Sequence, residues 1–292
     1  MASPPAVAVC TNRTPAEAAE ALATLARQLP GDRIAVVTSG LPASLVAAFR
    51  DIAPGPVLEE RDPGLSRARN RALAWAPADG VLAFVDDDAV VSPGWAEALE
   101  RAWAEADADV GCIGGPIRPR WTRQPPAWVS DPILPALTLL DLGPDPFELD
   151  PSVTTVYGAN ISFAVAALRA IGGFDPRLGH SGARVSFSEE DEAQRELARH
   201  GRRVLYAPDM VVEHVIGEDR LTRGSFVRRR FAYGRALGTR GARSRAVALT
   251  QLGRSAAGAL IAAARADGAK FMERAVRAAE NAGALTARRR TP

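Results

Sequence analysis

The chain has 292 residues, 47% of them hydrophobic and 24% charged, which is the composition of a soluble globular protein with a large core. Its first residues, MASPPAVAVC, lack the basic and apolar regions of a secretory signal peptide. Apolar runs such as AAGALIAAA are shorter than the roughly 20 residues that cross a bilayer. Cys10 and Cys112 lie in apolar, strand-like runs, so we expect reduced core thiols in a cytoplasmic protein rather than a disulfide framework.

The net charge of +2 is unevenly distributed along the chain. From Arg220 to the end, 17 side chains are basic and 3 are acidic, so this segment carries +14 and the preceding residues carry −12. Such a basic segment indicates an anionic partner (a phosphate ligand, a membrane surface or nucleic acid), or it is only a solvated helical surface. Lys270 is the only lysine of the chain.

Short apolar runs alternate with helical patterns over the first 115 residues. Repeated strand–helix units of this length predict a mostly parallel sheet with helices on both faces. The expected strands are Ala6–Cys10, Arg33–Thr38, Val57–Glu59, Val81–Val85 and Val110–Ile113, and the expected helices are Pro15–Gln28, Pro42–Asp51, Ser66–Trp75 and Pro93–Ala106.

The pattern changes from Pro116 to Pro151, where prolines are frequent and two tryptophans occur. We expect a long ordered loop there, because loops of this length are usually functional or disordered and tryptophans favour order. Regular patterns then resume, with a helix from Val165, a helix near Ser188–His200, the strand RVLYAP and the stretch MVVEHVI. After Leu221 the sequence is basic, alanine-rich and helical.

Three consecutive carboxylates, Asp86–Asp88, directly follow the fourth expected strand. In open α/β sheets ligands bind beyond the carboxyl ends of the strands, and alternating residues of an extended chain point the same way. We therefore expect Asp86 and Asp88 to share one Mg²⁺ or Mn²⁺ while Asp87 faces elsewhere. A merely solvated acidic turn has the same pattern.

Two catalytic interpretations fit this motif. The stretch VLAFVDDDAV satisfies the pattern of haloacid-dehalogenase-like phosphatases, in which Asp86 would be the nucleophile and Asp88 its neighbour. That chemistry also uses a later lysine to steady the phosphate, and no lysine precedes Lys270. The motif also follows three earlier strands rather than the first, so binding of a nucleotide sugar is the preferred interpretation.

Five segments in order resemble the family 2 inverting glycosyltransferases: VCTNR, GLSRARNRALAWAPADGVLAFVDDDAVVSPGW, VYGANISFAVAALRAIGGFDPRLG, SEEDEAQRELARHGRRVLYAPDMVVEHV and RLTRGSFVRRRFAYGRALG. The resemblance covers most of residues 6–237. It implies an α/β GT-A (nucleotide-diphospho-sugar transferase) fold, with a mostly parallel Rossmann-like sheet flanked by helices and a helical C-terminal extension. Residues 1–115 would bind the nucleotide sugar, 116–237 would form the acceptor-binding and catalytic half, and 238–292 would form the basic extension.

The same resemblance implies a divalent cation, Mg²⁺ or Mn²⁺, with Asp88 as its main ligand and Asp86 and His214 beside it. Many relatives carry an acid after the second strand to hold the base, whereas this chain has Thr38 or Ser39 there, so the base is left open. The donor-binding residues implied are Thr11, Asn12, Arg13, Thr38, Arg69, Asn70, Asp86 and Asp87.

Simpler roles are open to some of these residues. Asn12 or Thr14 would serve equally well as the cap of a helix that begins at Pro15. Arg69 would pair with Asp62 at the surface if it did not lie near the nucleotide.

The acceptor half carries the expected general base. Counting back from Gly201, the family pattern of an acidic pair and a further acid aligns with Glu189, Glu190 and Glu192. A shift of one residue selects Glu190 and Asp191 instead, so Glu190, common to both alignments, is the expected base. Acids in a first helical turn also favour the helix dipole without any catalysis. The acceptor-binding residues implied are Gly158, Ala159, Asn160, Trp121 and Trp128.

The expected function is therefore a metal-dependent inverting glycosyltransferase. Its partners would be a nucleoside-diphosphate sugar and a sugar, lipid-linked or small-molecule acceptor, with peripheral contact at the inner face of the membrane allowed. The alternatives are the phosphatase and a non-catalytic protein that binds an anionic membrane or nucleic acid through its basic C-terminal region. Helical arginines with few aromatic residues between them argue against nucleic-acid readout, so no nucleic acid is expected as partner.

Overall fold

The computed structural model describes residues 4–178, 189–239 and 243–287, which form two compact units. The first unit contains residues 4–119, 140–178 and 189–215, and the second contains 120–139, 216–239 and 243–287. The domain boundaries predicted at residues 115 and 237 come from the family resemblance and not from the contacts that define the compact units. They stay a prediction.

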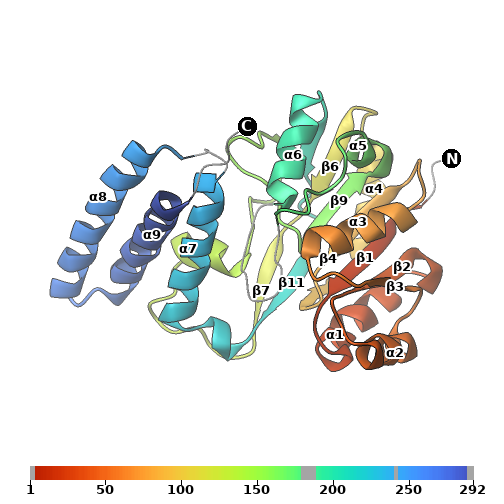
Figure 1. The fold of residues 1–292 in the computed structure, drawn as a ribbon, viewed down its shortest axis with the longest axis horizontal. Coiled ribbons are helices and arrows are strands. Elements are labelled where there is room, and N and C mark those ends of the chain that lie inside the picture. The colour runs from red at the N-terminus through yellow and green to blue at the C-terminus, as the bar shows by residue number, and fades with distance from the viewer. Residues whose placement is uncertain (1–3, 179–188, 240–242, 288–292) are drawn as a thin grey trace. The chain divides into compact units, whose positions relative to one another are not determined.

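The described strands of the first unit form an eight-stranded sheet in the order β3-β2-β1-β4-β9-β6-β10-β8 (Figure 1). Neighbours among β1 to β4 run parallel, as do β6 and β10, whereas β9 is antiparallel to β4 and β6, and β8 to β10. The predicted mostly parallel sheet is confirmed. The strands are β1 (Ala6–Thr11), β2 (Ile34–Ser39), β3 (Val57–Glu60), β4 (Val81–Val85), β6 (Val110–Gly114), β8 (Phe147–Leu149), β9 (Asn160–Ala164) and β10 (Arg203–Tyr206).

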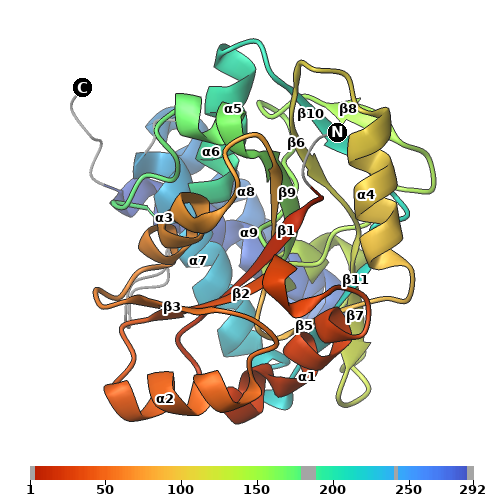
Figure 2. The same cartoon turned by 90° about the vertical axis from the view of Figure 1, so that its right-hand side faces the viewer.

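Helices cover both faces of this sheet, and Figure 2 shows α3 and α4 on opposite sides of it. On the face of α1 and α4, apolar side chains such as Leu22, Trp95 and Leu99 join one core with Val7 and Val85. The helices are α1 (Pro15–Ala26), α2 (Ala43–Ile52), α3 (Leu65–Trp75), α4 (Trp95–Glu105), α5 (Val165–Ala170) and α6 (Glu189–Arg199).

The starts of two helices refine the predictions. The carboxylate of Glu17 accepts hydrogen bonds from the Thr14 N–H at 2.9 Å and the Thr14 hydroxyl at 2.7 Å, which fixes the start of α1. The helix predicted from Pro93 begins only at Trp95, because Gly94 has a φ of 81° and interrupts helical geometry. Ser188, the predicted start of the helix before His200, lies outside the described residues.

The predicted loop from Pro116 to Pro151 is wrong in part, because it contains β7 (Ile117–Trp121), a 3₁₀ helix (Asp131–Leu137) and β8. A second sheet has the order β5-β11-β7, with β5 (Ala89–Val91) antiparallel to β11 (Val212–Ile216). β7 and β8 are edge strands that exist through backbone pairing with strands distant in sequence, which a proline-rich local pattern does not reveal.

The second unit contains a 3₁₀ turn (Glu218–Arg220) and the helices α7 (Arg223–Thr239), α8 (Arg245–Ala264) and α9 (Gly268–Thr286). The predicted helical character of this basic region is confirmed, and α9 packs against both α7 and α8. Within the described part of the chain, α8 is the one helix whose length and composition suffice to cross a membrane, a test that core helices of soluble proteins also pass. Only 17% of its apolar window is buried.

Candidate active site

The three aspartates form the turn that joins β4 to β5. The Asp86 carbonyl accepts the N–H of Ala89 at 3.1 Å, which closes the turn. In the pairing of β5 with β11, Ala89 lies opposite His214, and the N–H of Val215 donates to the Asp88 carbonyl at 2.9 Å. This register brings a histidine far away in sequence to the side of the acidic turn.

Asp86, Asp88 and His214 form a group able to hold a metal ion. One ligand atom from each lies within 4.8 Å of the others, and His214 Nε2 is 2.8 Å from Asp88 Oδ1. Burial, and next the charge of Asp88, raise the pKa of Asp86, as expected where two carboxylates share a site without a cation. Two carboxylates and one imidazole suit a hard or borderline divalent cation, and Mg²⁺ and Mn²⁺ are not distinguished.

Asp87 faces away from this group, as predicted. The parallel register of β1 and β4 brings Thr11 level with Asp87, and the Thr11 hydroxyl donates to its carboxylate at 2.5 Å. Arg13 lies 3.4 Å from Asp87 and donates to Asp88 at 2.7 Å. Burial raises the pKa of Asp87 to about 7, although Arg13 opposes the shift. Asp87 therefore anchors the turn after β1 to the acidic turn.

Arg69, on α3, is the buried cation of the site. Its guanidinium donates to Glu189 at 2.8 Å and lies 3.6 Å from Glu190, and its side chain is only 3% exposed. The alternative in which Arg69 pairs with Asp62 at the surface is wrong, because Arg67 is the residue that approaches Asp62, at 3.7 Å. This ion pair therefore ties α3 to the acidic helix α6.

Aromatic rings and a glycine fix the position of Arg69. Its guanidinium carbon lies 5.5 Å from the centroid of Phe84 and 5.6 Å from that of Phe174. A Cβ atom on Gly158 would lie 2.0 Å from Arg69 Nη2, so the backbone passes too close for any other residue. Gly158, expected on the acceptor side, has at least this structural role, and its acceptor contact stays a prediction.

The first turn of α6 carries four acids in different surroundings, Glu189, Glu190, Asp191 and Glu192. Glu189 is buried, and burial and then the charge of Glu190 raise its pKa well above the usual range. Asp191 is also buried and accepts the hydroxyl of Thr155 at 2.5 Å. The Glu190 side chain is 15% exposed, more than Glu189 and Asp191, whereas Glu192 is 32% exposed and pairs with Arg199 at 3.1 Å.

Some residues that shape the site carry no local sequence signal. Gln194 of α6 accepts the Val156 N–H at 3.0 Å and donates to the Val156 carbonyl at 2.9 Å, which attaches α6 to the segment before β9. Thr155 and Gln194 were not predicted, because their partners lie 36 and 38 residues away in sequence.

Asn160 has a structural role that the sequence did not predict. Its side chain is fully buried at the start of β9, where it accepts Trp95 Nε1–H at 3.0 Å and donates to the carbonyls of Pro116 and Met210. The amide thus holds the fold together, and the acceptor contact expected of it is not supported. Ala159 is likewise fully buried.

Two residues expected to bind the donor also make contacts that stabilise the fold. Asn70 exchanges two hydrogen bonds with the backbone of Phe174, at 2.7 and 2.8 Å. The Thr38 side chain is fully buried, with its hydroxyl 3.5 Å from the Leu58 carbonyl. Direct contact of either side chain with a nucleotide is therefore not supported, whereas Asn12 is exposed after β1.

The two tryptophans expected at the acceptor lie in the second unit. Trp128 packs edge-to-face on Phe226, with centroids 5.2 Å apart, and Arg223 lies 5.9 Å from its ring. Trp121 ends β7 and is half-buried. Trp128 is therefore a packing anchor, and an acceptor contact of either ring stays a prediction.

A Rossmann-like sheet with an Asp-x-Asp turn and a distant acidic helix is the arrangement that the resemblance to GT-A glycosyltransferases implies. The chain belongs to glycosyl transferase family 2, whose family model matches residues 6–168. It is 28% identical over 162 residues to a glucosyl-dolichyl phosphate glucuronosyltransferase from Haloferax volcanii. The aligned residues cover 55% of this chain and 50% of the relative. The chain thus spans about half the length of this curated relative.

Solved structures share the fold at low identity. TarS 1-349 of S. aureus, in complex with UDP-GlcNAc, is 16% identical with a TM-score of 0.55, covering 92% of this chain and 90% of its own. GalNAc-T7 with UDP, GalNAc and Mn²⁺ is 15% identical with a TM-score of 0.53, covering 81% of this chain and 51% of its own. The family match and the fold of these structures argue against the haloacid-dehalogenase-like phosphatase.

Proposed function

We propose that the chain is a metal-dependent inverting glycosyltransferase that moves a sugar from a nucleoside-diphosphate sugar to an acceptor hydroxyl. One observation carries this proposal: a ligand group of Asp86, Asp88 and His214 lies in the same unit as an accessible carboxylate, Glu190. The charges of Arg69 and Glu190 both act on Asp86, so the two groups share one electrostatic environment.

The donor side of the site is suited to a diphosphate. A divalent cation held by Asp88, with Asp86 and His214, would offset the negative charge of the leaving nucleoside diphosphate, a Lewis-acid role worth several kcal/mol. Arg13 presents a half-exposed guanidinium next to Asp88, and guanidinium groups pair well with phosphate oxygens. Thr11 and Asp87 keep the turn that carries Arg13 in place.

Glu190 is the proposed general base. It would take the proton of the acceptor hydroxyl as that oxygen bonds to the anomeric carbon, while the bond from this carbon to the diphosphate oxygen breaks and its electron pair leaves with the nucleoside diphosphate. One displacement without an enzyme nucleophile predicts inversion at the anomeric carbon. Arg69 and buried Glu189 hold Glu190 in position, and Asp191 is engaged by Thr155.

The comparisons support a nucleotide-sugar donor and a lipid-linked acceptor. TarS is described with UDP-GlcNAc, and the Haloferax volcanii relative is named for a dolichyl phosphate substrate. We extend both substrate classes to this chain as part of the proposal, with the reaction in the cytoplasm. The sugar and the base are left open, since no acidic residue follows β2.

A thermal-shift screen of nucleoside diphosphates and their sugars, with and without Mn²⁺, tests the proposal. A ligand at 100 times its Kd stabilises the native state by about 2.7 kcal/mol, and we expect one nucleotide to do so only with metal. Asp88→Asn should abolish the metal dependence, whereas Asp209→Asn, at an exposed acid, should preserve it. Absence of any shift from all nucleotides would contradict the proposed function.

A further inference from the structure

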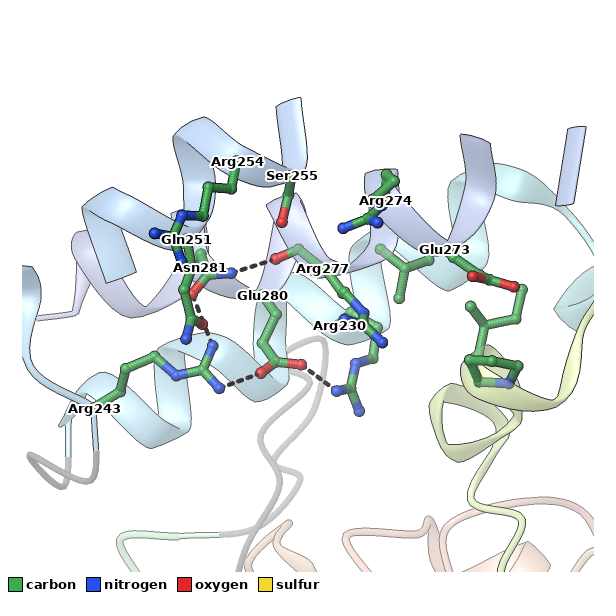
Figure 3. Close-up of a pocket in the computed structure, with 13 residues that line it drawn as sticks. Arg230, Arg243, Gln251, Arg254, Ser255, Glu273, Arg274, Arg277, Glu280 and Asn281 are labelled. Atoms are coloured by element: carbon green, nitrogen blue, oxygen red, sulfur yellow. Dashed lines mark hydrogen bonds and ion pairs between the residues drawn. The ribbon is translucent and has the colours of Figure 1, made fainter. Parts of the chain in front are cut away.

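The second unit contains a cavity of about 420 Å³ between α7, α8 and α9 (Figure 3). Its lining is dominated by positive charge, because five guanidinium groups oppose two carboxylates. The arginines are Arg230, Arg243, Arg254, Arg274 and Arg277. No part of the proposed transfer reaction uses this cavity.

Two of the arginines form ion pairs with the same buried acid. Glu280 lies between Arg230 and Arg243 and forms ion pairs with both, the second at 2.8 Å (Figure 3). The crossing of α7 and α9 is close at this point, since a Cβ atom on Gly234 would lie 1.9 Å from the Glu280 carbonyl oxygen. Because Gly234 has no side chain, the two helices approach closely, and Glu280 reaches both guanidinium groups.

The remaining three arginines have no counter-charge. Within the described part of the chain, the guanidinium groups of Arg254, Arg274 and Arg277 have no hydrogen-bond or ion-pair partner, and all three residues are exposed. The second carboxylate of the lining, Glu273, accepts the hydroxyl of Ser130 at 2.9 Å. Unpaired guanidinium donors that converge on one cavity match the oxygens of a phosphate group.

The side of α8 next to this cavity carries two exposed aliphatic side chains. Val247 is 47% exposed and Ile261 is 55% exposed. Val247, Arg254 and Ile261 follow one another at intervals of seven residues, about two helical turns, so they share one face of α8. An arginine of the cavity therefore lies in the same row as exposed aliphatic side chains.

We propose that this surface docks on an anionic phospholipid membrane, with a lipid phosphate in the arginine cavity and the side chains of Val247 and Ile261 in the adjoining boundary between headgroups and acyl chains. Exposed aliphatic side chains of a surface helix enter this boundary, and basic side chains near an anionic leaflet add to the affinity. Charge selects this occupant: a second copy would bring a second basic segment, and nucleic acid would leave the aliphatic side chains of α8 in water. The inference is independent of the proposed reaction.

Sedimentation of the full chain with vesicles tests the proposal. We expect binding to vesicles of equimolar phosphatidylcholine and phosphatidylglycerol, little binding to phosphatidylcholine alone, and weakening by salt. A triple substitution to Gln at Arg254, Arg274 and Arg277 should lower partitioning about 100-fold, because each basic residue near the surface is worth about five-fold. The matched control is a triple substitution to Gln at the exposed Arg27, Arg50 and Arg71 of the first unit, which should bind normally.

A second variant tests the apolar part of the surface. Val247→Gln with Ile261→Gln changes only exposed positions, so the fold should persist by circular dichroism while vesicle binding is lost. Asp88→Asn should bind vesicles like the wild type, which separates a failure of this inference from a failure of the proposed function. Three results would overturn the inference: no preference for anionic vesicles, stabilisation by inorganic phosphate without vesicle binding, or a dimer that the Val247 and Ile261 substitutions dissociate.

Discussion

Replacing Arg69 with methionine tests whether a buried ion pair holds the acidic helix in place. The guanidinium is 2.8 Å from Glu189, and both side chains are at most 3% exposed. At an effective dielectric constant of about 20, two unit charges at this separation attract by roughly 6 kcal/mol, most of which offsets their desolvation. Removing one partner leaves a buried carboxyl uncompensated, so Arg69→Met should lower the free energy of unfolding by about 3–5 kcal/mol.

Urea unfolding followed by far-UV circular dichroism measures this loss. The loss should shrink as pH falls, because the orphaned Glu189, whose pKa burial already raises, then takes up a proton. Glu189→Gln in the Arg69→Met background should cost much less than in the wild type, with a coupling energy above about 1 kcal/mol.

An exposed pair of equal length provides the control. Arg101 and Asp209 are also 2.8 Å apart, but their side chains are 51% and 72% exposed. Arg101→Met should cost less than about 1 kcal/mol, because water screens the pair. If Arg69→Met costs no more than Arg101→Met, or if the Arg69 and Glu189 substitutions are additive, the reasoning about the buried pair is wrong.

Three further predictions concern packing and ionisation. Gly158→Ala should destabilise the protein by about 1–3 kcal/mol and lower transfer, since its Cβ would displace Arg69, whereas Gly253→Ala, with no atom near its Cβ, should raise the melting temperature. Asn160→Leu should cost about 3 kcal/mol or more in urea unfolding, because three buried polar groups lose their partner, and a near-neutral effect would contradict its structural role. Desolvation raises the pKa of the half-buried Cys10 thiol to about 12, so little thiolate forms at mildly alkaline pH and alkylation should be slow, while rapid labelling would contradict the raised pKa. Because only the unfolded state releases this proton between pH 9.0 and 12, the free energy of unfolding should fall as pH rises there, by up to about 4 kcal/mol, and Cys10→Ser should reduce the fall.

Local patterns were sufficient to predict the elements of the first half of the sheet. Val81–Val85 is a continuous apolar run and forms β4 with the predicted bounds, because a strand buried on both faces needs apolar residues throughout. The opposite directions of Asp86 and Asp87 followed from the alternation of an extended chain. By contrast, β8 exists through its pairing with β10, and nothing in its own three residues indicates a strand.

The sequence patterns predicted the acidic cluster and the basic C-terminal helices, but not which residues their side chains contact. The pair of Arg69 with Glu189 spans 120 residues, and the contact of Thr155 with Asp191 depends on how α6 packs. Asn160 illustrates a different limit of local patterns: the family motif marks it for the acceptor, but does not reveal that its amide bonds Trp95 and two backbone carbonyls. Side-chain roles of this kind depend on tertiary register, which no local pattern specifies.

The transfer rate of Glu190→Gln with a nucleotide-sugar donor tests the central claim most directly. Glutamine keeps the size of the side chain and cannot accept the acceptor proton, so we expect the rate to fall at least about 100-fold while circular dichroism and donor binding stay unchanged. Glu196→Gln, at a partly exposed acid later in α6 that pairs with Arg199, should transfer at the wild-type rate. Wild-type transfer by Glu190→Gln would contradict the assignment of Glu190 as general base.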